Sequence, residues 1–468
     1  MIKRFREKFI GDRAFYAMVL AVSVPIMVQN GITSFVGLLD NIMVGRLGTE
    51  QMSSVSIVNQ LIFVYQLTTF GGLAGVGIFT AQYFGQKDDE GIRSTFRYKL
   101  WMGLILTIGI SLIFLIFGED LIQLYLNESG DGGDLKAALF YGRRYLRITL
   151  LGLPAFMLLQ IYAGTLRECG KTMIPMLAGV AAVMVNLIFN YLLIFGKWGF
   201  PAMGVDGAAY ATVLARFVEM DIVIVWTHCH KKENSFVEGL YRTLKVPVSQ
   251  AQKYFSKGLP LMLNECLWSA GMSMLVQCYS LRGLNAVVGL NIANTINNMF
   301  SVALNALGDS VAIIVGQLLG AGRMKEARDT DNKLIAFSIL SCLGIGLVML
   351  MLSPVFPAIY NTTEEARSIA TQVIIVQALF LPQNAYLSCV FFTLRAGGKT
   401  TLTFLYDCAF MWGLSVPVVY VLSRYTGIEV PVIYAVMQFT EWGKGIFGTI
   451  MVKRGTWLRN IVGAPEGD

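Results

Sequence analysis

The sequence predicts an all-α membrane protein with twelve transmembrane helices, arranged as two pseudo-symmetric six-helix bundles around a central cleft. Three observations support this fold class: the composition, the recurrence of long apolar segments and an internal repeat. Hydrophobic residues make up 55% of the 468 residues and charged residues 14%, whereas a soluble domain carries about 25% charged residues. The net charge of +7 is explained by basic residues at the ends of membrane helices, so nucleic acid is not an expected partner.

Apolar segments long enough to cross a bilayer recur along the whole chain, since a transmembrane helix needs about 20 such residues. We therefore predict twelve spans, six on each side of a charged stretch between His228 and Lys257. The first six cover about 14–42, 53–84, 98–118, 139–165, 173–196 and 205–228, and the second six about 254–281, 286–319, 332–352, 367–394, 401–423 and 430–452.

An internal repeat relates the two sets of spans. The offset that takes Pro25 to Pro260 also takes Asn59 to Asn294, Gln82 to Gln317 and Gly85 to Gly320. A slightly shorter offset places LRECGKT, which ends at Thr172, on LRAGGKT, which ends at Thr400. The chain is therefore two copies of one unit. We expect an N-terminal lobe at 1–229, a linker at 230–253, a C-terminal lobe at 254–452 and a tail at 453–468.

Basic residues gather at alternate connections and thereby predict the topology. Such clusters precede the first span and follow the second, fourth, sixth, eighth, tenth and twelfth; the first consists of Lys3, Arg4, Arg6 and Lys8. The loop after the third span is acidic instead, with Glu128, Asp131 and Asp134 among its residues. Because positive residues favour the cytoplasmic side, both termini and the linker are expected there. An even number of spans per half relates the halves by an axis along the membrane normal.

Carboxyl groups inside two spans are the first candidates for function. Gln29, Thr33, Gly37 and Asp40 share one helix face in the first span, and Glu265 opens a similar polar face in the seventh. An ionisable group at membrane depth is costly and points to a functional site. Burial in a medium of low dielectric favours the neutral form of a carboxyl group, so such an acid can exchange its charge for a bound ion.

Amide-rich faces mark further candidates. Such faces in lipid either join helices or line a wet cavity, and for a single asparagine both readings stay open. By contrast, the pairs Arg216–Glu219, with Asp221, and Glu441–Lys444 favour a structural role, and Asp407 is expected to reach the interface. The polar faces contain Asn291, Asn294, Asn298, Asn305 and Asp309 on the eighth span, Gln377, Asn384 and Ser388 on the tenth, and Asn186 and Asn190 on the fifth.

The sequence contains no nucleophile elbow, phosphate loop, kinase signature or zinc motif, so an enzyme is not expected. Without a Walker motif, active transport would draw on an ion gradient, with H⁺ or Na⁺ as coupling ion and no other cofactor.

Four phrases resemble the multidrug and toxic-compound extrusion (MATE) transporters over essentially the whole chain. They are the segment PIMVQNGITSFVGLLDNIMVGRLGTEQMSSVSIVNQ, the phrase YLRITLLGLPAFMLLQIYAGTLRECGKT, GVDGAAYATVLAR and VGQLLGAG. The resemblance implies a secondary antiporter that exports organic, often cationic, compounds from the cytoplasm as H⁺ or Na⁺ enters. It also implies residence in the inner membrane of a bacterium, as a monomer.

The resemblance further implies site residues. Asp40 matches an acid of a cation site in the N-terminal lobe, with Asn186, Asn190 and Thr212 as its neighbours. One branch of the family has an acid where Asn190 stands, which puts that branch's proton relay in doubt here. Glu265 matches an acid of the other lobe, where Asn384 replaces a second acid and weakens a full Na⁺ site. A Na⁺ site is therefore considered at Asp40 or Glu265. We also expect Asp309 to be a cation-coupling or substrate residue, and the cleft to be lined by Gln29, Asn59, Gln160, Gln377, Asn294 and Asn298.

Other readings differ in what they require. A flippase for lipid-linked oligosaccharides is the first alternative, but deep basic residues, which such a cleft would use, are scarce here. A membrane enzyme would need a cluster of acids and histidines, and only His228 and His230 lie close in sequence. A passive channel is disfavoured because two matched lobes suit alternating access.

Overall fold

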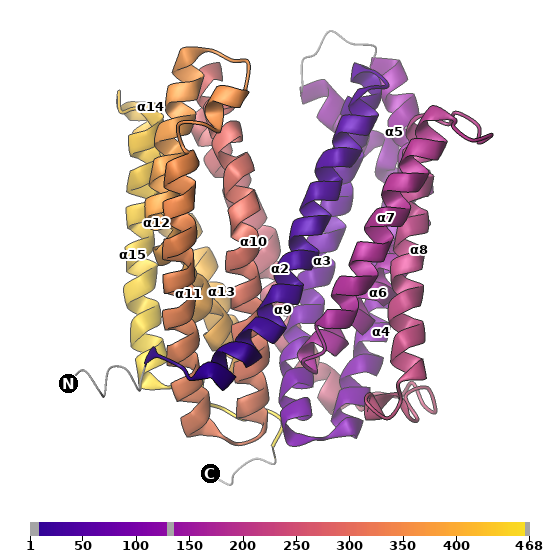
Figure 1. Cartoon of the computed structure of the whole chain (residues 1–468), viewed down its shortest axis with the longest axis vertical. Coiled ribbons are helices and arrows are strands. Elements are labelled where there is room, and N and C mark those ends of the chain that lie inside the picture. Colours follow the sequence, from indigo (N-terminus) through magenta and orange to yellow (C-terminus); the bar gives the residue numbers. More distant parts are fainter. Residues whose placement is uncertain (1–8, 129–134, 464–468) are drawn as a thin grey trace. The chain divides into compact units, whose positions relative to one another are not determined.

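The computed structural model describes residues 9–128 and 135–463, and within these it contains helices and no strand (Figure 1). The basic residues Lys3 to Lys8 and the acidic Asp131 and Asp134 lie outside the described residues. The helices are α2 (Arg13–Gly45), α3 (Thr49–Gln86), α4 (Asp89–Glu128), α5 (Leu135–Leu150), α6 (Leu153–Glu168), α7 (Met173–Phe195), α8 (Val205–Cys229), η1 (Ser235–Val237), α9 (Val248–Ser280), α10 (Leu284–Gly320), α11 (Met324–Leu352), η2 (Pro357–Ile359), α12 (Glu364–Ala396), α13 (Thr400–Phe404), η3 (Leu405–Ala409), η4 (Met411–Ser415), α14 (Val416–Tyr425) and α15 (Val430–Arg454).

These helices coincide with the predicted spans. In the described chain, nine are long and apolar enough to cross a membrane, and the pair α5 and α6, bent by 45°, makes a tenth. The sixth and twelfth predicted spans are α8 and α15, which carry the ion pairs Arg216–Glu219 and Glu441–Lys444. Charged residues within their apolar stretches exclude these two helices from that set.

The chain divides into two compact units. One unit contains the described residues of Met1–Met27, Ala81–Asp88 and Ser256–Asp468, and the other contains Val28–Thr80 and the described residues of Asp89–Phe255. We call them the C-terminal unit and the N-terminal unit. Because these boundaries cut through α2, α3 and α9, the lobe boundaries expected from the sequence stay a prediction.

Local sequence explains how several helices begin, end or deform. Pro25 and Pro260 lie inside the continuous helices α2 and α9. α7 ends at Gly196, whose φ of 63° suits glycine, and a side chain there would meet Ala202 at 2.7 Å. The eleventh span is interrupted by two π-helical turns, η3 and η4, around Asp407 and Ser415. Such turns often mark functional positions.

The C-terminal unit is packed around apolar side chains. One buried cluster joins α9, α10, α12, α14 and α15 and includes Leu275, Ile296, Val373, Val419 and Ile433. α12 packs against both α10 and α11, as Figure 1 shows. Because lipid tails are as apolar as these side chains, helices in a membrane are held together by van der Waals packing and not by transfer from water.

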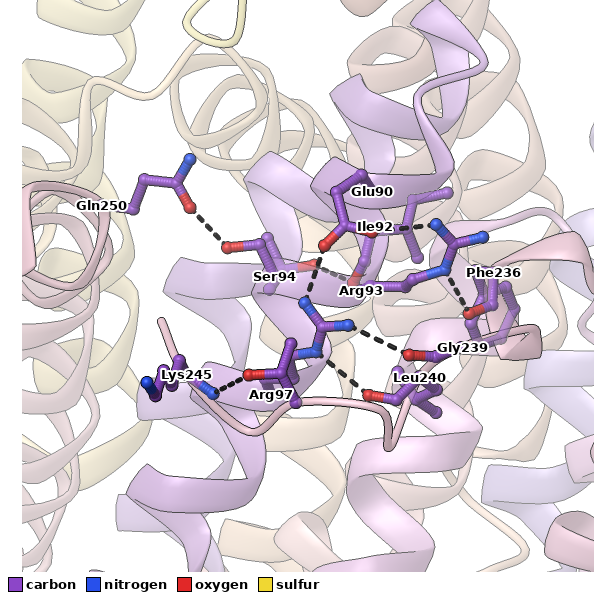
Figure 2. Close-up of polar contacts among 12 residues, drawn as sticks. Glu90, Ile92, Arg93, Ser94, Arg97, Phe236, Gly239, Leu240, Lys245 and Gln250 are labelled. Atoms are coloured by element: carbon purple, nitrogen blue, oxygen red, sulfur yellow. Dashed lines mark hydrogen bonds and ion pairs between the residues drawn. The ribbon is translucent and has the colours of Figure 1, made fainter. Parts of the chain in front are cut away.

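The linker is fastened to α4 through its backbone, as Figure 2 shows. Arg93 Nε donates to the carbonyl oxygen of Phe236 at 3.1 Å, and Arg97 Nε donates to that of Leu240 at 3.0 Å. Glu90 pairs with both guanidinium groups, at 2.9 and 2.7 Å, and so orients them. Because arginine offers several donors in a fixed plane, two residues satisfy carbonyls that would otherwise lack partners.

Lys171, between α6 and α7, fastens the start of the linker. Its Nζ donates to Asn234 Oδ1 at 2.8 Å and to the carbonyl oxygen of Glu233. Burial lowers the pKa of the Lys171 amine, and the nearby Glu233 charge opposes this shift. The linker is therefore an ordered part of the N-terminal unit.

Candidate functional site

A cavity of about 360 Å³ lies inside the N-terminal unit, between α2, α3, α5, α6, α7 and α8. Its walls combine aromatic and aliphatic side chains with a few polar groups, the usual composition of a small-molecule site. The charged residues that line it are Asp40, Arg216 and Glu219. Of the candidates from the sequence, Asp40, Asn59, Asn186 and Thr212 line this cavity.

Asp40 is the first member of a chain of polar contacts. Asn190 Nδ2 donates to Asp40 Oδ1 at 2.5 Å and to Asn186 Oδ1 at 3.0 Å, and Asn186 Nδ2 lies 3.4 Å from Thr212 Oγ1. Asn186 and Asn190 come one turn apart on α7, which brings their side chains within hydrogen-bonding distance of each other. The four residues that the resemblance implied are thus brought together.

Asn190 leaves one atom of this chain without a partner. Its side chain is buried, with a residue exposure of 1%, and Oδ1 makes no hydrogen bond in the described structure. Together with the Asp40 carboxylate and the Thr212 hydroxyl, it offers the oxygen ligands that hard cations take. Among the described residues, no group of three His, Cys, Asp or Glu could hold a metal ion.

The ion pair between Arg216 and Glu219 on α8 is confirmed, with Nη1 and Oε2 3.2 Å apart. The guanidinium also lies over the Phe156 ring, 5.5 Å from its centre. Asp221, which the sequence analysis grouped with this pair, is exposed. The sequence reading of the pair was structural only, and its position in the wall of the Asp40 cavity was missed.

The second candidate acid, Glu265, is half-buried on α9 in the C-terminal unit. The Arg395 charge attracts its carboxylate, and the Asp407 and Asp309 charges repel it. Asp309 is therefore close enough for its charge to act on Glu265, while its role in cation coupling stays a prediction. Asn384 lies half-buried on α12 and has no place in the cavity described above.

A charged cluster beside Glu265 was not anticipated. Lys444 Nζ lies 2.5 Å from Asp407 Oδ1 and 3.5 Å from Glu441 Oε2, and the side chains are only 11–13% exposed. Asn264, next to Glu265, donates to Asp407 Oδ2 at 3.2 Å. The expectation that Asp407 reaches the interface was wrong, because its carboxylate turns inward to Lys444. The Glu441–Lys444 pair itself is confirmed.

The other expected cleft residues have separate partners. Gln377 donates to Asn294 Oδ1 at 3.4 Å and to the Tyr434 hydroxyl at 3.2 Å. Gln29 accepts from Arg167 Nη2 at 2.8 Å and does not line the cavity. Asn298 is exposed and Gln160 half-buried. Their role in a cleft stays a prediction.

Sequence reasoning also missed aromatic and acidic residues. Tyr65 and Tyr145 line the cavity, and the Tyr145 hydroxyl lies 3.4 Å from Asn59 Oδ1. Tyrosines are common in membrane helices, so nothing in the sequence separates these two from packing residues. Asp331, buried on α11 with 1% exposure, accepts from Thr393 Oγ1 at 2.6 Å. It lies one residue before the span predicted at about 332–352, so the sequence analysis did not treat it as an acid inside a span.

Comparison with known proteins identifies relatives along most of the chain. The MatE family matches residues 25–192 and 260–421. The probable multidrug resistance protein YoeA of Bacillus subtilis is 26% identical over 410 residues, which cover 86% of each chain. The multidrug resistance protein PmpM of Pseudomonas aeruginosa is 25% identical over 428 residues, covering 88% of this chain and 84% of that protein.

Solved structures share the fold. The chain matches a MATE transporter crystallised in the bent conformation with a TM-score of 0.84, 19% identity and coverage of 94% and 95% of the two chains. An outward-facing multidrug resistance MATE family transporter matches with a TM-score of 0.82, at 19% identity and the same coverage. The expected all-α membrane fold with twelve helices is thereby confirmed.

Proposed function

Because the chain belongs to the MatE family of membrane transporters, we propose that it is a secondary active multidrug efflux antiporter. It exports organic compounds, often cationic, in exchange for H⁺ or Na⁺ by alternating access. Relatives named as multidrug resistance proteins support this proposal. Their names do not favour the alternative of a lipid-linked oligosaccharide flippase. The proposed location is the inner membrane of a bacterium, with cytoplasmic termini, as a monomer.

The observation that carries the proposal is Asp40, which lines a cavity in the N-terminal unit and is held by Asn190. A cationic substrate gains from the Asp40 charge, and the aromatic walls add cation–π attraction. Neutralising Asp40 with a proton or Na⁺ removes that gain, so substrate and coupling ion compete for one charged state. The ion shifts the conformational equilibrium only by its difference in affinity for the two states.

Everted membrane vesicles test this proposal, with an H⁺ gradient or a Na⁺ gradient imposed alone. Wild-type vesicles are expected to accumulate ethidium with one of these gradients. Asp40→Asn should abolish the accumulation because the variant cannot exchange its charge, while its amount in the membrane stays unchanged. Full accumulation by Asp40→Asn would refute the assignment.

Glu265→Gln tests the C-terminal unit separately. If Glu265 binds the coupling ion, the variant loses the dependence on that ion's gradient; if it does not, the gradient dependence equals that of the wild type. Growth of an efflux-deficient bacterium on ethidium distinguishes the exporter from the flippase, because only an exporter of such cations raises tolerance.

A further inference from the structure

The Asp40 cavity contains a fixed positive charge. Its charged lining residues are two acids, Asp40 and Glu219, and one base, Arg216. With all three ionised, the cavity carries a net charge of minus one. Arginine stays protonated in proteins, so its charge is constant while the charge of an acid can be neutralised.

The Arg216 guanidinium is held on one side of the cavity. Glu219 Oε2 lies 3.2 Å from Nη1, and the guanidinium is placed over the Phe156 ring at 5.5 Å. No ion pair within 4.0 Å joins it to Asp40 in the described structure, yet its charge attracts the Asp40 carboxylate. The Asp40 carboxylate therefore lines the cavity without forming an ion pair with Arg216, and the permanent positive charge of that residue lies in the wall of the same cavity.

We propose that Arg216 is a tethered cation that sets the cavity charge to minus one and so selects monovalent over divalent organic cations. This inference rests on the proposed function and adds a residue that determines its specificity. One bound monovalent cation neutralises the cavity, whereas a divalent cation leaves an uncompensated positive charge. Uncompensated charge in a medium of low dielectric is costly.

The same sum of charges explains how the substrate is released. When a proton or Na⁺ occupies Asp40, only the neutral Arg216–Glu219 pair remains, and a monovalent substrate loses its electrostatic attraction. Without Arg216, Glu219 would still hold such a substrate after Asp40 is loaded. Arg216 thus makes the Asp40 charge the one that decides binding.

Ethidium and propidium form a suitable pair of probes, because both carry the same aromatic ring system, with one and two positive charges respectively. Their binding to the purified full-length protein is measured by fluorescence anisotropy. Arg216→Gln takes the cavity to minus two. It should raise the affinity for propidium relative to ethidium by at least about tenfold, since even a charge about 12 Å away contributes that much at an effective dielectric constant near 20.

Combined variants separate the charge from the architecture. Asp40→Asn takes the cavity to zero and should weaken ethidium binding by at least about tenfold. Adding Arg216→Gln to Asp40→Asn restores minus one and should restore the binding. The double variant of Arg216→Gln with Glu219→Gln removes the pair without leaving a charge, and should keep the wild-type ratio of the two dyes. Arg143→Gln breaks an exposed ion pair, with Glu119 at 3.0 Å, and is the matched control.

Rescue by the second substitution is a result that a merely structural role of Arg216 would not give. An unchanged dye ratio in Arg216→Gln overturns the inference, and so does a failure of Arg216→Gln to restore ethidium binding to Asp40→Asn. If Arg216→Gln alone fails to fold, the two double variants decide the question. If vesicles export no ethidium while the dye ratios shift as expected, the proposed function fails and the charge rule stands; the reverse result rejects the charge rule alone.

Discussion

Replacing Lys444 by methionine should cost the C-terminal unit more stability than any exposed ion pair. Lys444 lies between Asp407, at 2.5 Å, and Glu441, at 3.5 Å, and all three side chains are close to nine-tenths buried. Methionine has a similar length and fills the space, so the change removes the charge and leaves two carboxylates facing each other.

The expected loss in the free energy of unfolding is about 3–5 kcal/mol, the usual cost of breaking a buried pair by removing one partner. The remaining hydrogen bonds reduce the loss toward the lower value. Asn264 Nδ2 donates to Asp407 at 3.2 Å, and the Ser415 hydroxyl lies 3.1 Å from Glu441 Oε1. Adding Asp407→Asn and Glu441→Gln to Lys444→Met should recover most of the loss, because no buried charge is then uncompensated.

Thermal denaturation in detergent, followed by the loss of the monodisperse elution peak, measures the effect. Arg323→Met is the control, since Arg323 pairs with Glu326 three residues away but both side chains are about half exposed, at 60% and 46%. This control should change stability by less than about 0.5 kcal/mol. Equal stability of the Lys444→Met single variant and the triple variant would refute the reasoning, because it would mean that the orphaned carboxylates cost nothing.

Two further predictions concern packing and the linker. Gly320→Ala places a Cβ 1.9 Å from the carbonyl oxygen of Gln82, so α3 and α10 must separate at this point. The free energy of unfolding should therefore fall by about 1–3 kcal/mol. Gly344→Ala is the control because its Cβ meets nothing within 4 Å, and equal melting temperatures of the two variants would contradict the prediction. Arg97→Gln removes the donors to two linker carbonyls. The expected cost in the free energy of local unfolding is about 1–3 kcal/mol, so proteolysis and hydrogen exchange in 236–244 should become faster. Arg242→Gln, at an exposed residue of the same segment, should leave both rates unchanged.

Much of the fold could be predicted from the sequence because lipid imposes length and composition on every spanning helix. The predicted spans match the helices even where a span is bent, as at Leu150 and Leu153 between α5 and α6. Residues of one helix face were also predictable, since Asn186 and Asn190, four residues apart, form a hydrogen bond with each other.

Contacts between distant segments could not be predicted in the same way. The Asp407 carboxylate and the Lys444 amine come from η3 and α15, and nothing in the residue spacing indicates that η3 turns Asp407 inward. Likewise, Arg216 and Glu219 form an ion pair within one helix, so their spacing gives no indication that Asp40 lines the same cavity. Helical periodicity reports which residues share a face, but not which face of another helix lies opposite.

The repeat shows why a result for one half does not transfer to the other. Thr165 and Thr393 correspond by the offset that relates the LRECGKT and LRAGGKT phrases. Thr165 Oγ1 lies 3.3 Å from Lys99 Nζ, and Glu168 neutralises this lysine at 2.5 Å. Thr393 instead donates to Asp331, and in the described residues no base forms an ion pair with that acid.

Duplication has therefore kept the helices and the threonine while the charge beside it has reversed. Helix packing depends on shape and tolerates such a change, but ion binding depends on the sum of local charges. The N-terminal unit encloses Asp40 with Arg216 and Glu219, and the C-terminal unit surrounds Glu265 with Arg395, Asp407 and Asp309. These two sets of charged residues differ in number and sign. A coupling role established at Asp40 therefore does not transfer to Glu265 by symmetry, and the gradient dependence has to be measured for each acid alone.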